Sequence, residues 1–205
     1  MKTQYSFKKA AQILFRNLFH VEREIVFELD LTKKGKPAKA KIPLGFRWGT
    51  KNDILSMDRK RFGYGMRGKR YSINRLEKGD KFVVAIVDGL ITGYGWVMFG
   101  EIELTKVWHK KLPAEKACLY KEFVQEPYRN MGINRARRTV VLDYLKQKGY
   151  KTAYIISFTR NAASVRSIKA SGFQPIGRFY SLTLLGVEIP YIGKELLGHL
   201  RRALD

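Results

Sequence analysis

The stretch from Phe82 to Gly100 constrains the fold most, because it is long and apolar enough to suggest a membrane helix. It spans nineteen residues and holds one charge, Asp88. Asp88-Gly89 divides the run, however, and Asp-Gly between apolar segments is the strongest short-range hairpin signal. The flanks are rich in β-branched and aromatic residues, which favour strands. We therefore predict a hairpin of two buried strands, 81–87 and 90–99, and reject a membrane span.

Alternating helix and strand patterns fill the rest of the chain and predict one mixed α/β domain over residues 1–205. Helical spacing marks residues 7–19, 50–62, 69–78, 134–148 and 161–171. Strand patterns mark 24–31, 45–48, 118–124, 152–158, 174–185 and 187–192. Thr50 and Asp53 have the spacing of a capping box. Residues 1–44 are expected to form an N-terminal helix and strand extension, 45–192 the core, and 193–205 a C-terminal tail.

The composition favours anionic partners and a reducing compartment. Forty Lys and Arg residues face eighteen Asp and Glu, and the resulting net charge of +22 is spread over both halves. Cys118 is the only cysteine, so no internal disulfide is possible. No secretory signal is recognised, and a cytoplasmic protein is expected. The basic amphipathic helix over 7–19 either lies on an anionic membrane or packs on its own domain.

Residues 124–134 carry the strongest functional signal. An apolar strand ends at Val124, the chain bends through Arg129 and Gly132, and a helical pattern follows. A helix start gathers backbone N–H groups without partners, which suits phosphate oxygens. Arg129 and Arg135 add positive charge. This segment therefore predicts a site for a pyrophosphate group.

Other motif-like strings in the sequence give weaker evidence of function. Residues 63–68 match G-x-G-x-x-G by letters, but no buried strand precedes them, so we expect only a basic loop. Six basic side chains and two aromatic residues over 59–70 leave single-stranded nucleic acid as a minor alternative. His20, His109 and His199 are far apart in sequence, and no metal is expected.

The segment from Tyr120 to Phe173 resembles the core of the GCN5-related N-acetyltransferase (GNAT) superfamily. The matches to its two signatures are Val124, Pro127, Arg129 and Gly132, then Asn161, Ser164, Gly172 and Phe173. Asn134 replaces a small residue of the first signature, and Ser164 replaces an alanine of the second. The family often has a tyrosine acid where this chain has Ile168.

The resemblance implies a mixed, mostly antiparallel sheet with helices on both faces and a V-shaped split between the strands 118–124 and 152–158. Acetyl-CoA would lie in this opening, with its pantetheine arm paired to the edge of the first strand. The residues expected to bind it are Phe123, Val124, Arg129, Asn130, Met131, Gly132, Ile133, Asn134, Arg135 and Asn161. Arg137 and Arg138 are further candidates for contact with its phosphates.

For the chemistry, we expect Glu122 to act as base, with a surface ion pair as the competing interpretation. Tyr120 is expected to share its strand face. Tyr180 or Tyr128 would replace the missing acid. The acceptor is expected to be a small primary amine, plausibly on an anionic sugar or cell-envelope precursor. The alternatives are a longer-chain acyltransferase with an acyl pocket beside Trp96 and Met98, or an impaired module that binds an anionic ligand or nucleic acid.

Overall fold

A computed structural model describes residues 19–33, 35, 37–62, 65–104, 108–185 and 187–204. The helix predicted over 7–19 lies outside these residues, apart from Phe19, which begins a strand. The hypothesis of membrane contact through that helix therefore stays a prediction. Among the helices in the described ranges, none is long and apolar enough to cross a membrane.

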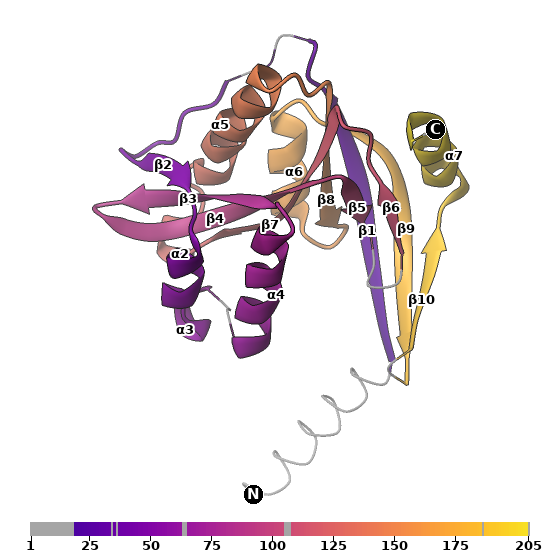
Figure 1. Ribbon diagram of the computed structural model, residues 1–205, viewed down its shortest axis with the longest axis horizontal. Helices are drawn as coiled ribbons and strands as arrows, with labels where there is room; N and C mark the ends of the chain where they lie inside the picture. The colour runs from indigo at the N-terminus through magenta and orange to yellow at the C-terminus, as the bar shows by residue number, and fades with distance from the viewer. Residues whose placement is uncertain are drawn as a thin grey trace, which may run out of the picture.

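An eight-stranded sheet organises the molecule, in the order β10-β9-β1-β8-β7-β4-β3-β2 (Figure 1). Its strands are β1 Phe19–Asp30, β2 Gly45–Trp48, β3 Lys81–Val87, β4 Leu90–Phe99, β7 Lys116–Val124, β8 Thr152–Phe158, β9 Gln174–Leu184 and β10 Val187–Ile192. Only β7 and β8 pair in parallel; the other pairs are antiparallel. A short second sheet joins β5 Glu101–Glu103 to β6 His109–Lys111.

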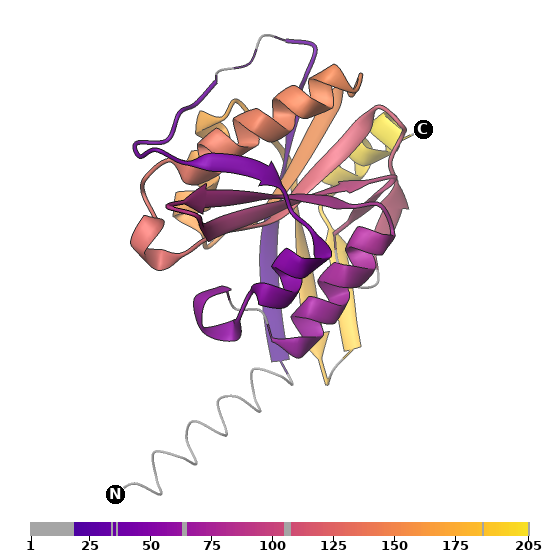
Figure 2. The same ribbon diagram turned by 60° about the vertical axis from the view of Figure 1, so that its left-hand side comes forward.

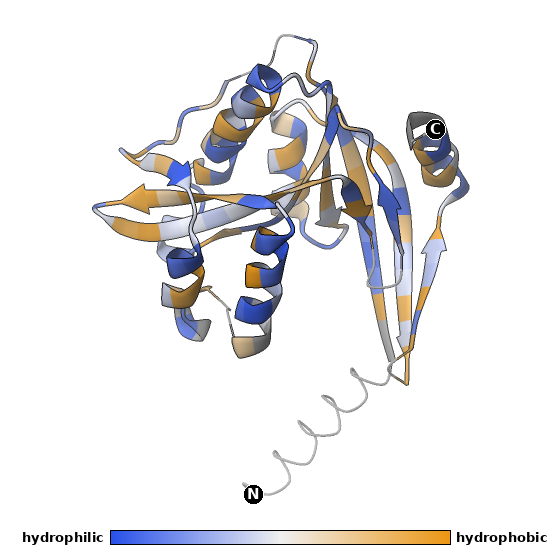
Figure 3. Cartoon of the chain, viewed as in Figure 1, coloured by the Kyte–Doolittle hydropathy of each residue, from blue (hydrophilic) through white to orange (hydrophobic). Residues whose placement is uncertain are grey.

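The predicted hairpin of β3 and β4 is confirmed. Asp88 and Gly89 both have positive φ, 49° and 76°, as a tight two-residue turn between paired strands requires. Figure 3 shows the apolar character of β3, which lies in the interior of the sheet.

Strand β1 is not appended to the core but lies inside the sheet, antiparallel to both β8 and β9. Its neighbouring side chains Val26 and Phe27 are fully buried on opposite faces, because successive strand residues point in opposite directions. The segment expected to form part of an N-terminal extension therefore contributes to both hydrophobic cores.

Helices cover both faces of the sheet, as predicted (Figure 2). Helices α5 Ile133–Gln147 and α6 Ala162–Ala170 cover one face, which we call the α5–α6 face. The opposite face carries α2 Lys51–Ser56, α3 Arg59–Phe62, α4 Met66–Glu77 and α7 Lys194–Leu204. The short 3-10 turn η1 Glu126–Tyr128 connects the end of β7 to the bend before α5.

The helices differ from the expectation in three places. The helix predicted over 50–62 is two helices, broken at Met57 and Asp58, although the capping box of Thr50 and Asp53 is confirmed. Helix α4 starts at Met66, so residues expected in a basic loop form its first turn. The C-terminal tail contains α7, which is anchored by His199 Nε2, 2.9 Å from Glu28 Oε2 on β1.

Residues 31–33, 35 and 37–44 form a strap, without regular structure, that follows α5 from its C-terminal end to its N-terminal end (Figure 2). Lys146 Nζ donates to the Lys33 carbonyl at 3.0 Å, and the Ala38 N–H donates to Thr139 Oγ1 at 3.0 Å. Near the helix start, the Lys41 N–H donates to the Met131 carbonyl at 2.9 Å. The strap therefore places exposed lysines next to the N-terminus of α5.

Candidate active site

The two central strands separate part of the way along the sheet. Pairing between β7 and β8 joins Lys116–Leu119 to Thr152–Ile155 and stops there, although both strands continue. Beyond this point β7 stays paired with β4, and β8 stays paired with β1. The split therefore leaves one edge of each strand open toward the other, as the resemblance implies.

A β-bulge in β7 lies next to the split. Lys121 has a φ of 46°, and Lys121 and Glu122 together oppose the single residue Gly95 of β4. An extra residue in a strand reverses the faces that follow it. Tyr120 therefore points away from the α5–α6 face and Glu122 points toward it, so the expectation that they share a face is wrong.

A cavity of about 610 Å³ lies at the split and receives side chains from both faces of the sheet. From the α5–α6 face come Glu122, Ser157, Asn161 and Ser164, and from the opposite face come Tyr71, Met98, Tyr120, Phe158 and others. The open edges of β7 and β8 thus border a passage through the sheet. Such a passage lets two reactants meet from opposite sides.

The half of the cavity away from α5 and α6 is acidic. Glu22 and Glu24 lie two residues apart on β1, and Glu188 lies on β10 on the same side of the sheet. Burial, followed by the charges of Glu22 and Glu188, raises the pKa of Glu24 to about 8, although Arg160 opposes the shift. A carboxyl group with a pKa near neutrality is suited to accept a proton at working pH.

The sequence analysis did not single out Glu24. The alternation of Glu22, Glu24 and Val26 marked a strand, but that strand was assigned to an extension outside the core. Its insertion beside β8 brings Glu24 opposite Phe158, at the end of the strand that borders the split.

Tyr120 is held by a buried ionic network on the same side of the sheet. Its hydroxyl donates to Asp80 Oδ2 at 2.6 Å, and Arg75 Nε donates to the same oxygen at 2.6 Å. Burial and then the neighbouring Asp80 raise the pKa of Tyr120 well above its ordinary value. Tyr120 is therefore a fixed hydrogen-bond donor that forms part of the cavity wall.

Among the described residues that line the cavity, Lys121 is the one with a basic side chain. Its Nζ lies 3.5 Å from the centre of the Tyr71 ring, a cation–π contact. Burial lowers the pKa of Lys121 to about 8, against the charge of Glu103.

Glu122 does not present a free carboxylate. Arg138 Nε lies 2.9 and 3.0 Å from its two oxygens, and Arg137 Nη2 lies 2.9 Å from Oε1. Burial favours protonation of this carboxyl, but Arg138 and Arg137 outweigh burial and lower its pKa. A carboxylate stabilised in its charged form by two guanidinium groups is a poor proton acceptor, so this geometry favours an ion pair over a general base.

The two arginines are also committed to the interior rather than to phosphates. Arg138 reaches Ser167 Oγ of α6 at 3.0 Å, and Arg137 Nη1 donates to the Tyr94 carbonyl at 2.6 Å. Both side chains are 1% exposed. This cluster of Glu122, Arg137 and Arg138 ties β7 to β4, α5 and α6 beside the split.

The chain bends into α5 as the sequence predicted. Gly132 has a φ of 78° and precedes the first helical residue, Ile133. Intrahelical bonding begins with the Ala136 N–H, which donates to the Gly132 carbonyl at 3.0 Å. The amides of Ile133, Asn134 and Arg135 therefore lie in the first turn, where an α-helix has no carbonyl to offer them.

Buried polar atoms support a ligand site at this bend. Asn134 Oδ1 and Arg135 Nε have no hydrogen-bond partner among the described residues, although both atoms are buried. Arg129 is exposed and folds back, with Nε 3.3 Å from the Val124 carbonyl. Lys39 and Lys41 of the strap add exposed positive charge nearby.

The remaining residues that were predicted to bind the coenzyme lie at the split, in the core or in the bend before α5. Val124 and Asn161 lie at the ends of β7 and β8, and Asn161 caps α6 by accepting from the Ser164 N–H at 3.0 Å. Phe123 instead stacks on Tyr94 across the sheet, with ring centres 5.5 Å apart. Asn130 has a φ of 65° and, like Met131, belongs to the bend itself.

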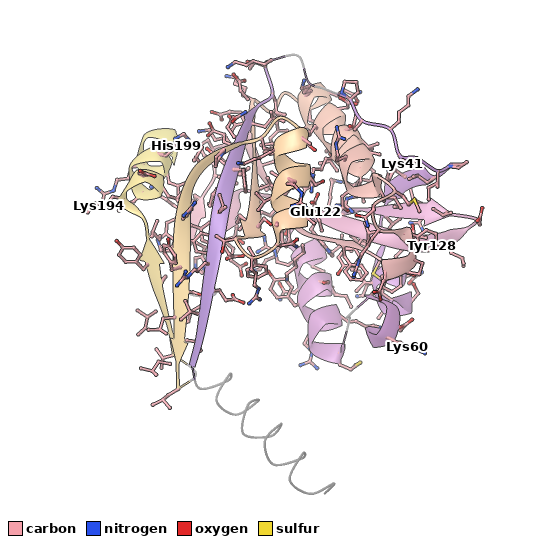
Figure 4. All side chains as sticks on the ribbon, turned by 180° about the vertical axis from the view of Figure 1, so that it is seen from behind. Lys41, Lys60, Glu122, Tyr128, Lys194 and His199 are labelled. Carbon is pink, nitrogen blue, oxygen red and sulfur yellow. The ribbon has the colours of Figure 1, made fainter. Side chains whose placement is uncertain are left out.

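Neither proposed substitute for the missing acid lines the cavity. Tyr180 lies on β9 beside Arg23 and Tyr191 and borders a separate hollow. Tyr128 lies in η1, toward the same side of the molecule as Lys41 in Figure 4. Ile168 is fully buried in the core. On the α5–α6 side, Ser157 and Ser164 bring hydroxyls to the border of the cavity, and their oxygens are 2.9 Å apart.

Trp96 and Met98 were expected to flank a wider acyl pocket in the longer-chain alternative. Both are buried in the core, and Met98 also lines the cavity. Trp96 stacks on Phe82 with ring centres 4.5 Å apart, and both residues are nearly fully buried. In the part of the chain that the structure describes, no group of three or more His, Cys, Asp or Glu residues is arranged to hold a metal ion.

No protein-family model and no curated protein matches the chain. Solved structures do match it. A GCN5-related N-acetyltransferase from Sphaerobacter thermophilus superposes with a TM-score of 0.58 at 14% identity, over 89% of this chain and 58% of that one. A GNAT-family acetyltransferase from Colwellia psychrerythraea gives 0.56 at 15% identity, over 89% and 61%. A tandem GNAT protein from the clavulanic acid pathway gives 0.55 at 14% identity, over 76% and 51%.

These likenesses establish the fold: the chain has the mixed α/β fold of the GCN5-related N-acetyltransferases. It spans between about half and three fifths of the length of those three proteins.

Proposed function

We propose that this protein transfers an acetyl group from acetyl-coenzyme A to a primary amine by direct attack of the amine on the thioester. The observation that carries the proposal is the cavity through the sheet at the split between β7 and β8, in a chain with the GNAT fold. The donor would enter from the α5–α6 face and the amine from the opposite face.

The bend into α5 fits the phosphates of the donor. First-turn amides, positive charge from Arg129, and exposed lysines of the strap converge there. The free edge of β7 beyond Leu119 offers backbone groups to the pantetheine arm, as an added strand would use them. The unpartnered Asn134 Oδ1 and Arg135 Nε provide two further polar contacts.

Glu24 fits the role of the base in place of Glu122. In this proposal the amine loses a proton to the Glu24 carboxylate, its nitrogen bonds to the thioester carbon, and the carbon–sulfur bond breaks. A backbone N–H at the β7 bulge would stabilise the negative charge that develops on the carbonyl oxygen. The Ser164 hydroxyl, beside Ser157, would donate a hydrogen bond to the departing thiolate, which then takes its proton from solvent.

The acceptor expected from the basic composition does not suit this cavity. Carboxylates on β1 and β10 would repel a phosphorylated sugar or an anionic cell-envelope precursor. We therefore retain a small primary amine as the acceptor and set the anionic acceptor aside. The buried Trp96 likewise favours acetyl over a longer acyl chain.

Calorimetric titration with coenzyme A, together with thiol release from acetyl-CoA in the presence of amines, tests the proposal. We expect binding by the wild type, and about tenfold weaker binding by Arg129→Ala because one charged contact is lost. Arg70→Ala is the matched control, since Arg70 is exposed on α4 across the sheet. Absence of coenzyme binding, or equal affinity in Arg129→Ala and Arg70→Ala, would contradict the assignment.

A further inference from the structure

An exposed apolar surface lies at the outer end of the sheet, where β10 forms the edge beside β9 and β1 (Figure 1). In the part of the chain that the structure describes, ten large apolar side chains are exposed, and six of them belong to these strands or to the turn between β9 and β10. The six are Val21, Leu184, Leu185, Val187, Ile189 and Tyr191. A concentration of this kind on one surface marks an interaction site, whereas single exposed apolar residues need no explanation.

Strand alternation separates the side chains of β1, β9 and β10 by charge. Glu22, Glu24 and Glu188 lie on the face that borders the cavity. On the α5–α6 face, the strand pairing arranges the side chains in cross-strand rows. From the hairpin tip inward, the rows are Leu184 and Val187, then Val21, Leu182 and Ile189, then Arg23, Tyr180 and Tyr191, then Ile25 and Arg178. No side chain in these rows is acidic.

The rows change from aliphatic through aromatic to basic with distance from the tip. Successive rows lie about 7 Å apart along the strands. Beyond the tyrosines, a hollow of about 660 Å³ is bordered by Lys169, Arg178 and Lys194, with Glu195 as the acidic residue among its described lining. A lipid bilayer has the same order, because acyl chains are followed by the interface that tyrosine prefers and then by the phosphates.

The turn at the hairpin tip gives a second, independent indication. Leu185 has a φ of 50° and is 71% exposed. Asp88 stands at the corresponding place of the β3–β4 hairpin, directly after the last paired strand residue, with a φ of 49°. Asn and Asp tolerate this left-handed conformation, whereas it strains a bulky apolar residue. The tip therefore keeps an exposed leucine where a polar residue would be less strained, which points to a function of that side chain.

We propose that the tip of the β9–β10 hairpin inserts into an anionic phospholipid bilayer. Leu184, Leu185 and Val187 would enter the acyl region, and Arg178 and Lys194 would contact the lipid phosphates. Insertion removes apolar side chains from water, and each basic residue near the anionic surface adds attraction. The residues named here do not line the cavity, so the inference is independent of the proposed acetyl transfer.

Charge favours a bilayer over the other occupants of such a surface. A second copy would bring the arginines of two chains, each with a net charge of +22, toward one another. An anionic bilayer instead compensates Arg23 and Arg178. Single-stranded nucleic acid would also compensate them, but its bases stack on aromatic rings and gain nothing from an aliphatic tip.

The predicted helix over 7–19 precedes this surface in the chain. Phe19 opens β1 and pairs with Leu184 at the tip, so the segment joins the described structure there. Point substitutions in the hairpin of the full chain separate its contribution from that of residues 1–18.

Flotation with vesicles of phosphatidylcholine and phosphatidylglycerol, compared with phosphatidylcholine alone, tests the inference on the full chain. We expect binding to the anionic vesicles that weakens as salt is raised. Leu185→Asn should weaken it at least about tenfold without loss of thermal stability, since asparagine tolerates a positive φ. Arg178→Gln should weaken it about fivefold. Leu90→Asn is the matched control, because Leu90 is 58% exposed next to the turn of the β3–β4 hairpin and should leave binding unchanged.

A fluorescent label identifies the part of the protein that enters the bilayer. Cys118, the only native cysteine, is buried, so a polarity-sensitive thiol dye can be directed to Leu185→Cys or, as the control, to Asp88→Cys. Anionic vesicles should shift the emission to the blue at position 185 alone.

Absence of binding to anionic vesicles would overturn the inference, and a dimer that Leu185→Asn dissociates would then assign this surface to a second copy. Equal vesicle affinity of the wild type and Leu185→Asn, or no blue shift at position 185, would also overturn it and assign membrane contact to another part of the chain. Failure to bind coenzyme A or to acetylate an amine refutes the proposed function and leaves this inference standing.

Discussion

Arg138 donates through Nε to both carboxylate oxygens of Glu122, at 2.9 and 3.0 Å, and its side chain is 1% exposed. Arg137 contacts the same carboxylate. Two buried guanidinium groups share one carboxylate, so Glu122 compensates the positive charge of both arginines in the interior. Breaking a buried pair by removing one partner is strongly destabilising, because the remaining charge is left without compensation.

We therefore expect Glu122→Gln to lower the free energy of unfolding by about 3 kcal/mol at pH 7, measured by urea denaturation. The control is Glu126→Gln, which alters an exposed carboxylate four residues further along the chain. If Glu122 acted mainly as the base, Glu122→Gln would instead keep wild-type stability and lose turnover.

Gly95 makes room for Arg137. A Cβ at position 95 would lie 2.5 Å from the Arg137 guanidinium carbon, and that guanidinium is already held by Glu122 and the Tyr94 carbonyl. We expect Gly95→Ala to destabilise the protein by about 2 kcal/mol in urea denaturation, as overpacking does. Gly198→Ala is the comparison. It has no atom within 4 Å of the added Cβ and lies inside α7, so it should stabilise by up to about 1 kcal/mol. Equal effects of the two substitutions would count against the packing argument.

Local signals explain how much of the fold could be predicted. Asp88-Gly89 defined the hairpin, Asn161 and Gly172 enclosed α6, and β8 was predicted with its observed bounds. The position of β1 could not be predicted in this way. Its period-two pattern shows that it is a strand but does not say which strands it joins, and its partners β8 and β9 are more than a hundred residues away.

The site was predicted less completely for the same reason. The bend at Gly132 has a local signature and was found. The bulge at Lys121 has none, since lysine rarely adopts positive φ, and without it Tyr120 and Glu122 fall on the same face. Glu24 reaches the cavity only through the long-range pairing of β1 with β8, which the sequence pattern does not contain.

The capping box of α2 predicts a pH-dependent contribution to stability. Asp53 accepts from Arg47 Nη1 and Nη2, at 2.7 Å each, and from the Thr50 N–H. The Arg47 hydrogen bonds are the largest effect that lowers the pKa of Asp53 to about 2, against burial. The folded-state pKa lies below the unfolded value, so this stabilisation is present above about pH 4 and is lost as the pH falls toward 2.

We expect Asp53→Asn to cost about 1 kcal/mol at pH 7, a figure kept small because Arg47 is half exposed. The difference from wild type in urea denaturation should shrink progressively below pH 4. A constant difference between pH 7 and pH 2 would show that the charge of Asp53 does not matter.

Glu24 predicts the opposite pH dependence of stability. Its folded-state pKa of about 8 lies above the unfolded value, so the folded protein binds this proton more tightly. The contribution of this bound proton to the free energy of unfolding is fully present below about pH 4.5 and is lost as the pH rises through 8. Glu24→Gln carries no such proton. Between pH 4 and pH 9, the free energy of unfolding of Glu24→Gln should therefore increase relative to that of the wild type by on the order of 2 kcal/mol.

The same substitution should slow acetyl transfer. A general base contributes about a hundredfold or more, so Glu24→Gln should lose at least that factor at pH 8 while keeping its affinity for coenzyme A. In the wild type, kcat/KM for the amine should rise toward pH 8 as Glu24 ionises, and this rise should be absent from the residual activity of Glu24→Gln. The two measurements check each other, because a Glu24 that only packs in the cavity wall would change the stability profile alone. A wild-type pH profile retained in Glu24→Gln would assign the base to another group.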